Sequence, residues 1–237
     1  MPTYTVTGTT DPFIQAKLLQ GETIIAERDA MAAMTGTVDI VAKARGGFLS
    51  SLVRSATTGE SFYLQEITAN RGAGTVMLAP RYPGEVRVVS LTNESWMLSD
   101  GTFLAADPSL TLETSRNSSW GAALVGNTGG FFMLKISGTG AMIISSVGAI
   151  HELIIRPSEE LIVDSGHAIA WPAHLEMRAS LSTNQNAGFL GKVVGAAKSG
   201  EGVVLRFSGG STGGRILVSS RSRKSLIDWI GSFLPGK

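Results

Sequence analysis

Short apolar runs alternate with Gly, Pro, Ser and Asp residues from residue 4 to about residue 220. Runs of this kind between turn-forming residues are typical of short β-strands. Inside the runs apolar positions recur with a period of two, which a strand with one buried face requires. The pattern predicts an all-β protein, and we expect residues 1–237 to form a single domain because all-β units often reach ~200–250 residues.

The strand pattern repeats three times. One segment type covers residues 22–40, 94–112 and 159–177, so its copies are offset by 72 and 65 residues. Equivalent positions are apolar in all three copies, which indicates one shared structure. They include Ile24, Trp96 and Leu161, then Ala26, Leu98 and Val163, then Ala33, Ala105 and Ala170.

A second segment type begins at Gly59, Gly129 and Gly200, and each copy continues through a glycine-containing turn into another strand. We interpret both types as hairpins, with repeat units of about 13–40 plus 200–220, 59–113 and 129–178. Unpaired strand edges invite aggregation. We therefore predict that the last hairpin pairs with the first and closes a pseudo-threefold β-sandwich or double-stranded β-helix-like assembly. The alternative is three diverged hairpins in an ordinary sandwich without rotational symmetry.

Long glycine-rich links join the two segment types, and each link carries an apolar cluster. Loops longer than ~12–15 residues are uncommon without a role of their own. If the threefold holds, the three clusters gather into one patch for a partner or for self-association. Alternatively, each link folds back as a short helix over the adjacent strand edge. The candidate surface residues are Phe48, Leu49, Trp120, Leu124, Phe189 and Leu190.

The pattern changes to helical spacing near the C-terminus, which predicts a short helix over about 223–234. Ser222 or Ser225 can cap its start, and Pro235-Gly236 can end it. We expect its apolar stripe to pack on the protein's own sheet, with docking on a neighbouring subunit as the alternative.

Composition excludes several kinds of chemistry. The chain has no cysteine, so disulfides, thiolate metal sites and thiol nucleophiles are excluded. Twenty Lys and Arg residues against 19 Asp and Glu give a formal charge of +1, which disfavours nucleic acid as a partner. The first residues resemble neither a secretory nor a transit segment, and the apolar runs are too short to span a bilayer. We therefore expect a cytoplasmic protein.

Candidate catalytic groups are scarce. His151, His167 and His174 each lie near an acidic residue, but none has metal-ligand spacing. The glycine-rich run 208–214 resembles a phosphate cradle, yet it leads into a strand, and a turn explains it better. We expect neither an enzyme nor a bound cofactor or metal. The densest basic cluster, which could bind an anion, is Arg215, Arg221, Arg223 and Lys224.

The chain resembles the altered inheritance of mitochondria protein 24 family. The resemblance covers residues 13 to about 220 and is carried by the strand opening at Gly59–Phe62, its echo at 200–209, the Pro83-Gly84 turn and the segment Phe103–Ala105. The opening Gly129-Gly130 departs from the acid that the family pattern has beside glycine. The resemblance implies an all-β fold similar to that of tryptophan RNA-binding attenuation protein, and oligomers among bacterial members. It implies no catalytic residues.

Together these observations predict a non-enzymatic scaffold or interaction protein that self-associates, with a trimer favoured and a protein partner or a membrane surface as further contacts. The alternative is a module that binds nucleic acid or another anionic ligand through the C-terminal basic cluster.

Overall fold

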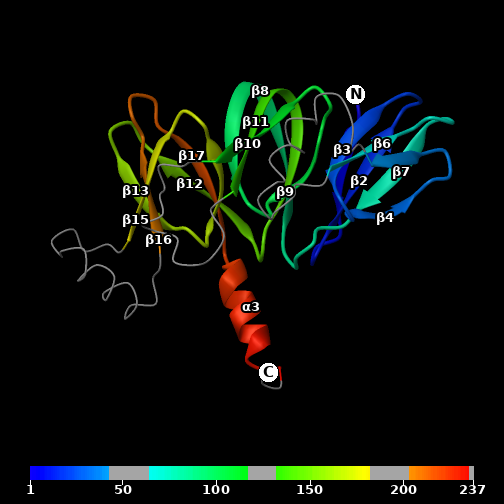
Figure 1. Cartoon of the computed structure of the whole chain (residues 1–237). Helices are drawn as coiled ribbons and strands as arrows, with labels where there is room; N and C mark the ends of the chain where they lie inside the picture. The colour runs from blue at the N-terminus through cyan, green and yellow to red at the C-terminus, as the bar shows by residue number, and fades with distance from the viewer. Residues whose placement is uncertain (43–63, 117–131, 182–202, 235–237) are drawn as a thin grey trace.

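The computed structural model describes residues 1–42, 64–116, 132–181 and 203–234, which form β-strands and one short helix in three successive lobes (Figure 1). Lobe 1 contains β1 (Thr3–Thr7), β2 (Phe13–Leu18), β3 (Thr23–Glu27), β4 (Met31–Met34), β5 (Asp39–Ala42), β6 (Leu64–Thr68) and β7 (Gly74–Leu78). Lobe 2 contains β8 (Val86–Ser99), β9 (Phe103–Ala106), β10 (Thr111–Arg116) and β11 (Phe132–Ser145). Lobe 3 contains β12 (Ile150–Ile155), β13 (Glu160–Asp164), β14 (Ala168–Pro172), β15 (Glu176–Leu181), β16 (Val203–Ser208) and β17 (Gly214–Ser219).

Each lobe repeats the same strand pairing. In lobe 1 the orders are β2-β7-β4 and β3-β6-β5, and in lobe 3 they are β12-β17-β14 and β13-β16-β15. In lobe 2 the long strands β8 and β11 each serve both sheets, and β9 and β10 complete them. Apart from β1, each lobe therefore contains six successive strand segments. Segment 6 pairs with segments 1 and 3, and segment 5 pairs with segments 2 and 4, all antiparallel. This confirms the predicted all-β fold, with the same antiparallel pairing repeated in each lobe.

The predicted hairpins are wrong, because the strands on either side of each repeat turn lie in different sheets. β6 pairs with β3 and β5, whereas β7 pairs with β2 and β4. In lobe 2 the turn is absent, and β11 runs through with a register shift between Gly138 and Gly140, both of which have positive φ. Glycine kinks of this type bend a strand, so the chain passes from one sheet to the other.

The predicted closure of the chain on itself is also wrong. β16 and β17 pair within lobe 3, not with β2 or β3 of lobe 1, and the sheets stay open. The reason is that each first-type segment pairs with the second-type segment that follows it. In lobe 1 both bury their apolar faces in one cluster, where Ile24 of β3 joins Ile67 of β6 and Val76 of β7.

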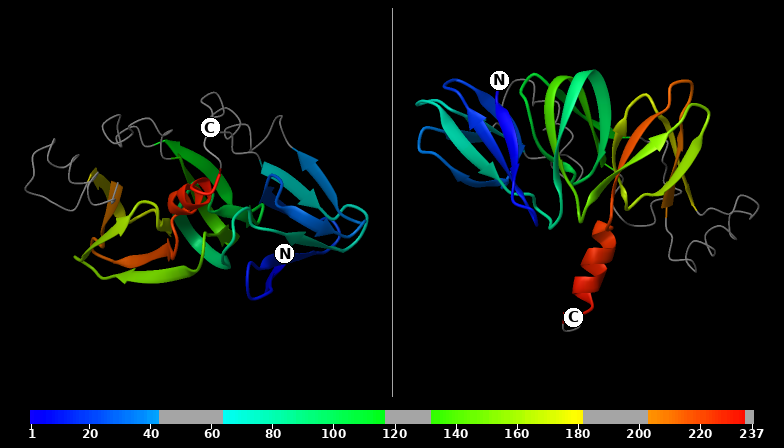
Figure 2. Two further views of the ribbon diagram at one scale, coloured as in Figure 1. Left: turned by 90° about the horizontal axis from the view of Figure 1, so that it is seen from below. Right: turned by 180° about the vertical axis from the view of Figure 1, so that it is seen from behind.

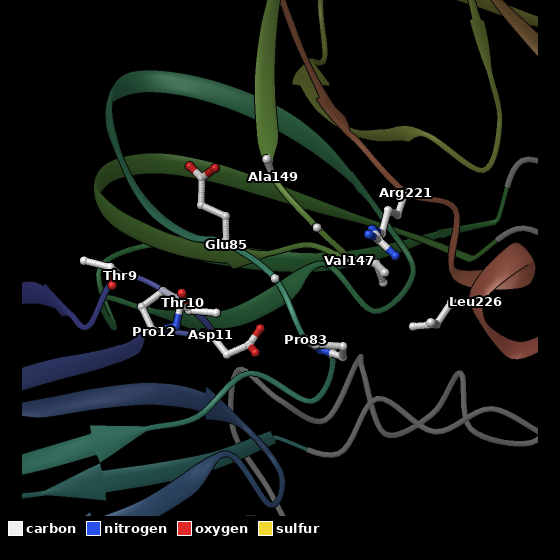
Figure 3. A pocket seen from close by; sticks show the side chains of 12 residues that line it. Thr9, Thr10, Asp11, Pro12, Pro83, Glu85, Val147, Ala149, Arg221 and Leu226 are labelled. Atoms are coloured by element: carbon white, nitrogen blue, oxygen red, sulfur yellow. The ribbon is translucent and has the colours of Figure 1, made fainter. Parts of the chain in front are cut away.

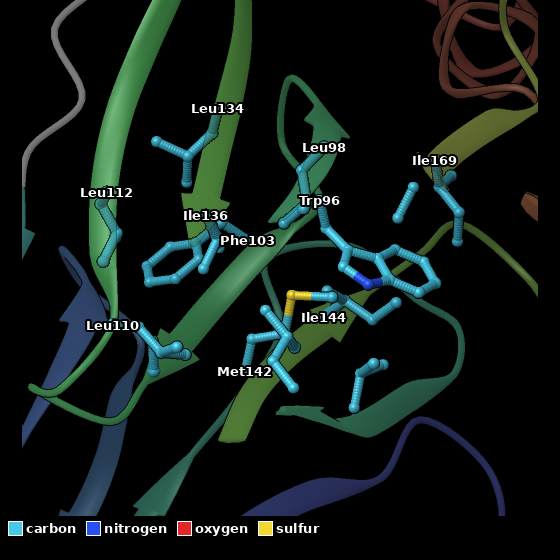
Figure 4. Packing of buried hydrophobic residues seen from close by; sticks show 14 of the residues in the cluster. Trp96, Leu98, Phe103, Leu110, Leu112, Leu134, Ile136, Met142, Ile144 and Ile169 are labelled. Atoms are coloured by element: carbon cyan, nitrogen blue, oxygen red, sulfur yellow. The ribbon is translucent and has the colours of Figure 1, made fainter. Parts of the chain in front are cut away.

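The hydrophobic clusters of the lobes include side chains from neighbouring lobes. Trp96, Phe103 and Met142 lie in the cluster of lobe 2, and Ile169 from lobe 3 packs against them (Figure 4). On the other side, Leu104 of lobe 2 joins the cluster of lobe 1. Apolar burial therefore holds neighbouring lobes together as well as each lobe alone.

A buried polar contact adds to the junction between lobes 1 and 2. The Tyr4 hydroxyl donates to Asp107 Oδ1 at 2.6 Å, and the Ala141 amide donates to Oδ2 at 2.7 Å. Burial, with the hydrogen bond to this carboxylate, raises the pKa of Tyr4 well above its ordinary value. The tyrosine therefore stays a donor, and β1 is fixed to lobe 2.

The predicted helix is present as α3 (Arg223–Gly231). Ser222 caps it by accepting from the Ser225 amide at 3.5 Å. The expectation that it packs on its own sheet is wrong: none of its residues is buried, and it points away from the lobes (Figures 1 and 2). An ion pair of 2.8 Å between Arg223 and Asp100 holds its base at lobe 2, so the helix leaves the body at this point. No helix in the described ranges is long and apolar enough to cross a membrane.

Candidate interaction edges

The apolar surface predicted from the loops falls outside the residues that the structure describes. This applies to Phe48, Leu49, Trp120, Leu124, Phe189 and Leu190. The site is therefore built from the described strands and the helix.

The predicted basic cluster does not form one anion site. Arg215 stacks 5.1 Å from the ring centre of Trp96 and lies 3.8 Å from Glu152. Lys224 pairs with Asp228 one helical turn later. Arg223 is the residue that pairs with Asp100, and Arg221 lines a cavity of about 410 Å³ with Pro83, Val147 and Leu226 among its walls (Figure 3). Three of the four cations thus face carboxylates of the same chain.

Two of the three histidines, His167 and His174, have structural contacts. His167 Nδ1 lies 2.8 Å from the Ser219 carbonyl oxygen, and His174 Nε2 lies 3.0 Å from that of Gly213. His167, in the turn before β14, thus contacts the end of β17, and His174, in the turn after β14, contacts the residue before β17. Within the described ranges no three His, Asp or Glu side chains gather in a way that suits a metal ion. The glycine-rich run that ends at Gly214 forms the turn between β16 and β17, but these strands do not pair, so the predicted hairpin turn is wrong.

Neighbouring lobes are joined by one rule. β3 of lobe 1 pairs with β9 of lobe 2, with Ala26 opposite Ala105. β8 of lobe 2 pairs with β14 of lobe 3, with Leu98 opposite Ala170. The two pairs are equivalent in the repeat, because Leu98 follows Ala26 by the first offset of 72 residues and Ala170 follows Ala105 by the second offset of 65 residues. In both places segment 2 of one lobe pairs with segment 3 of the next lobe.

Among the described strands, the same rule leaves two complementary edges unpaired at the ends of the row of lobes. Segment 3 of lobe 1 is β4, which is the last strand of its sheet. Segment 2 of lobe 3 is β13, which is also a sheet edge. β4 and β13 lie at opposite ends of the molecule (Figure 1). Each edge presents the backbone groups that its counterparts use between lobes.

Apolar side chains on these edges are exposed. Met34 on β4 is 39% exposed and Ile162 on β13 is 41% exposed. The equivalents of Met34 are Ala106 and Trp171, which are 0% and 2% exposed and lie on strands that pair with a neighbouring lobe. The exposure at β4 therefore follows from a missing neighbour and not from a polar sequence.

Cavities accompany the two lobe junctions and repeat with them. One of about 470 Å³ is lined by Gly21–Thr23 and Asp107–Ser109, and one of about 670 Å³ by the equivalent Asn93–Ser95 with Pro172 and His174. Gly21 and Asn93 both have positive φ, as does their third equivalent, Ser158. Ser158 lies in the turn before the free edge β13. The turn that flanks each junction is therefore already present where lobe 3 has no neighbour.

Comparison with known proteins agrees with this architecture. The family model described as mitochondrial biogenesis AIM24 matches residues 4–221. The chain belongs to the AIM24 family. This confirms the resemblance given by the sequence and places α3 beyond the matched segment.

Two relatives of this AIM24 protein come from Streptococcus pyogenes. An uncharacterized protein of serotype M6 is 28% identical over 230 residues, which cover 94% of this chain and 87% of the relative. The crystal structure of a protein from that species superposes with a TM-score of 0.78 at 24% identity, and the match covers 99% of this chain and 100% of the other. The second likeness supports the fold alone. The expected similarity to tryptophan RNA-binding attenuation protein stays a prediction.

Sequence reasoning did not single out Met34 or Ile162. The alignment placed Ala33 with Ala105 and Ala170, and two of these three strands pair with another lobe. A repeat position with a partner in two copies implies a partner in the third. That inference needs the pairing, which the sequence pattern does not contain.

Proposed function

We propose that this protein is a non-enzymatic scaffold that assembles with copies of itself, in which β13 of one copy pairs with β4 of the next. The observation that carries the proposal is the repeated lobe junction, used twice inside the chain and left unfilled at both ends. The surface that joins lobes inside the chain is thus available between chains.

The repeat offsets give the register of the proposed ladder. Ile25 faces Ala106 in the first junction and Met97 faces Trp171 in the second. In the repeat, Ile162 is the equivalent of Ile25 and Met97, and Met34 is the equivalent of Ala106 and Trp171. The same register therefore places Ile162 opposite Met34 of the next copy. Directly opposed side chains on antiparallel strands stabilise each other by ~0.2–1 kcal/mol per pair, and the ladder adds backbone hydrogen bonds.

The two edges differ, so the assembly is head-to-tail. Such contacts build a ring when the rotation closes and a filament when it does not. A ring of three copies, the state favoured from the sequence, has one such ladder between each pair of neighbours. A scaffold of this kind needs no catalytic residues.

The alternative of a module that binds nucleic acid has less support. Arg215, Arg223 and Lys224 each lie beside a carboxylate of the same chain. Phosphate would have to compete with these acidic groups, and the formal charge of +1 adds little attraction.

Lysine at either edge tests the proposal. We expect the wild-type chain to scatter light with a mass several times the 24.8 kDa of one copy. Met34→Lys and Ile162→Lys should each reduce the mass to that of one copy, because a buried unpaired charge opposes the ladder.

Matched controls are Val41→Lys and Ile154→Lys, which alter side chains that are 48% and 64% exposed in the same two lobes but outside the proposed ladder. The controls should keep the mass of the assembly. A wild-type chain that is monomeric at all concentrations, or edge variants with unchanged mass, would contradict the proposal.

A further inference from the structure

We propose that α3 and the residues after it, 223–234, form an arm that inserts its apolar tip into the surface of a lipid bilayer. The proposal goes beyond self-assembly and does not depend on it. It rests on the exposure of the arm, on the distribution of charge along it and on its direction.

Large apolar side chains are concentrated on the arm and are not covered by the lobes. Trp229 is 61% exposed, Phe233 72% and Leu234 66%, with Ile227 and Ile230 at 55% and 47%. The rings of Trp229 and Phe233 meet edge to face at 5.3 Å. Patches of this kind on a soluble domain mark a contact with another phase or molecule.

Charge and apolar character are separated along the axis of the arm. Of its charged residues, Arg223 and Lys224 lie at the base and Asp228 lies one helical turn further along, with Arg221 just before the helix. The last six described residues, 229–234, carry no charge, and all are exposed. An amphipathic helix that docks in a protein groove needs one apolar face and one polar face. This tip is apolar or small around most of its circumference, which suits lipid better.

Aromatic residues beside basic ones match the chemistry of the membrane interface. Trp is favoured at the boundary between headgroups and acyl chains, and Lys and Arg side chains reach back to the headgroups. The segment 221–234 has three basic residues and one acidic residue; Arg223 pairs with Asp100 and Lys224 with Asp228, so Arg221 is the cation of this segment that can meet an anionic headgroup. Nine helical residues span about 13 Å, enough to reach the acyl boundary but not to cross a bilayer.

The direction of the arm leaves the tip accessible. Figure 1 and the right view of Figure 2 show α3 extending beyond the described strands, with its tip away from the lobes. The salt bridge from Arg223 to Asp100 and the Ser222 cap fix the base, as described above. A fixed base presents the tip without the cost of ordering a loose tail.

The test is co-sedimentation of the full chain with sucrose-loaded vesicles of phosphatidylcholine, with and without phosphatidylglycerol. We expect binding to both compositions, stronger with the anionic lipid. The double variant Trp229→Ser/Phe233→Ser should lose at least about tenfold in partition coefficient, because two large apolar side chains no longer enter the bilayer.

The matched control is Leu19→Ser/Ile154→Ser, which removes two apolar side chains that are 65% and 64% exposed on lobes 1 and 3. It should bind vesicles as the wild type does. Equal binding by the wild type and the Trp229/Phe233 variant, or no binding by the wild type, would overturn the proposal.

Light scattering without lipid separates this proposal from self-assembly. The Trp229→Ser/Phe233→Ser chain should keep the mass of the wild type. A lower mass would mean that the arm docks on a second copy of the chain, which would also overturn the lipid proposal. Edge variants such as Met34→Lys test self-assembly and leave the arm intact.

Discussion

Replacing Gly84 with alanine is expected to lower the free energy of unfolding by about 4 kcal/mol. Gly84 lies in the link from lobe 1 to lobe 2 and forms a parallel bridge with Gly148 in the next link. Its φ is +154°, and a Cβ there would overlap the Ser146 carbonyl oxygen and lie 2.5 Å from the Gly148 amide nitrogen. The overlap involves backbone atoms, so the links must separate.

Separation of the links breaks hydrogen bonds on both sides of Gly84. The Glu85 amide donates to the Gly148 carbonyl at 2.8 Å, and the Gly148 amide donates to the Pro83 carbonyl at 3.1 Å. The loss of these bonds adds to the steric cost. Thermal unfolding followed by circular dichroism should show a melting temperature lower by roughly 10 °C or more.

Gly36→Ala is the control for this change. Nothing lies within 4 Å of a Cβ at Gly36, and its φ is outside the left-handed region. We expect a change within about 0.5 kcal/mol. Similar melting temperatures for the two variants would show that the links do not lock the lobes together.

Replacing Trp171 with alanine is expected to cost about 4 kcal/mol as well. Trp171 is 2% exposed and packs edge to face on Phe207, with ring centres 5.2 Å apart. It also sits opposite Met97 in the junction between lobes 2 and 3. The cavity left by the indole therefore weakens both the core of lobe 3 and its contact with lobe 2.

Chemical denaturation measures this effect, with Trp229→Ala as the control of equal size. Trp229 is 61% exposed, so its removal should change the free energy of unfolding by no more than about 0.5 kcal/mol. Equal losses for the two variants would contradict the assignment of Trp171 to the core and of Trp229 to the exposed arm.

The sequence predicted the strands of this fold but not their partners. The equivalence of Ile24, Trp96 and Leu161 is confirmed, because β3, β8 and β13 occupy the same place in their lobes. A period of two reports which face of a strand is buried, and it does not report which strand lies alongside. Hairpins were therefore expected where Gly138 and Gly140 bend one continuous strand.

The candidate site, formed by the edge strands β4 and β13, was less predictable from the sequence than the strands themselves. Ala33 on β4 and Val163 on β13 have the same apolar character as their covered equivalents, so no residue pattern distinguishes a free edge from a paired one. Only the arrangement of the lobes in space shows which edge strands are paired and which are free. The helix was predictable from its spacing, but its exposure was not, since an apolar stripe on a helix usually faces a core.

Disulfide formation between engineered cysteines tests the proposed junction most directly, because the natural chain has no cysteine. Met34→Cys and Ile162→Cys are prepared as separate variants, mixed and oxidised. Opposed residues of an antiparallel pair have Cα atoms about 4.5–5.5 Å apart, within the range that a disulfide bridges. We expect a covalent dimer from the mixture, none from either variant alone, and none when Ile154→Cys replaces Ile162→Cys. A mixture that stays uncrosslinked, or that crosslinks equally through Ile154→Cys, would contradict the junction between β4 and β13.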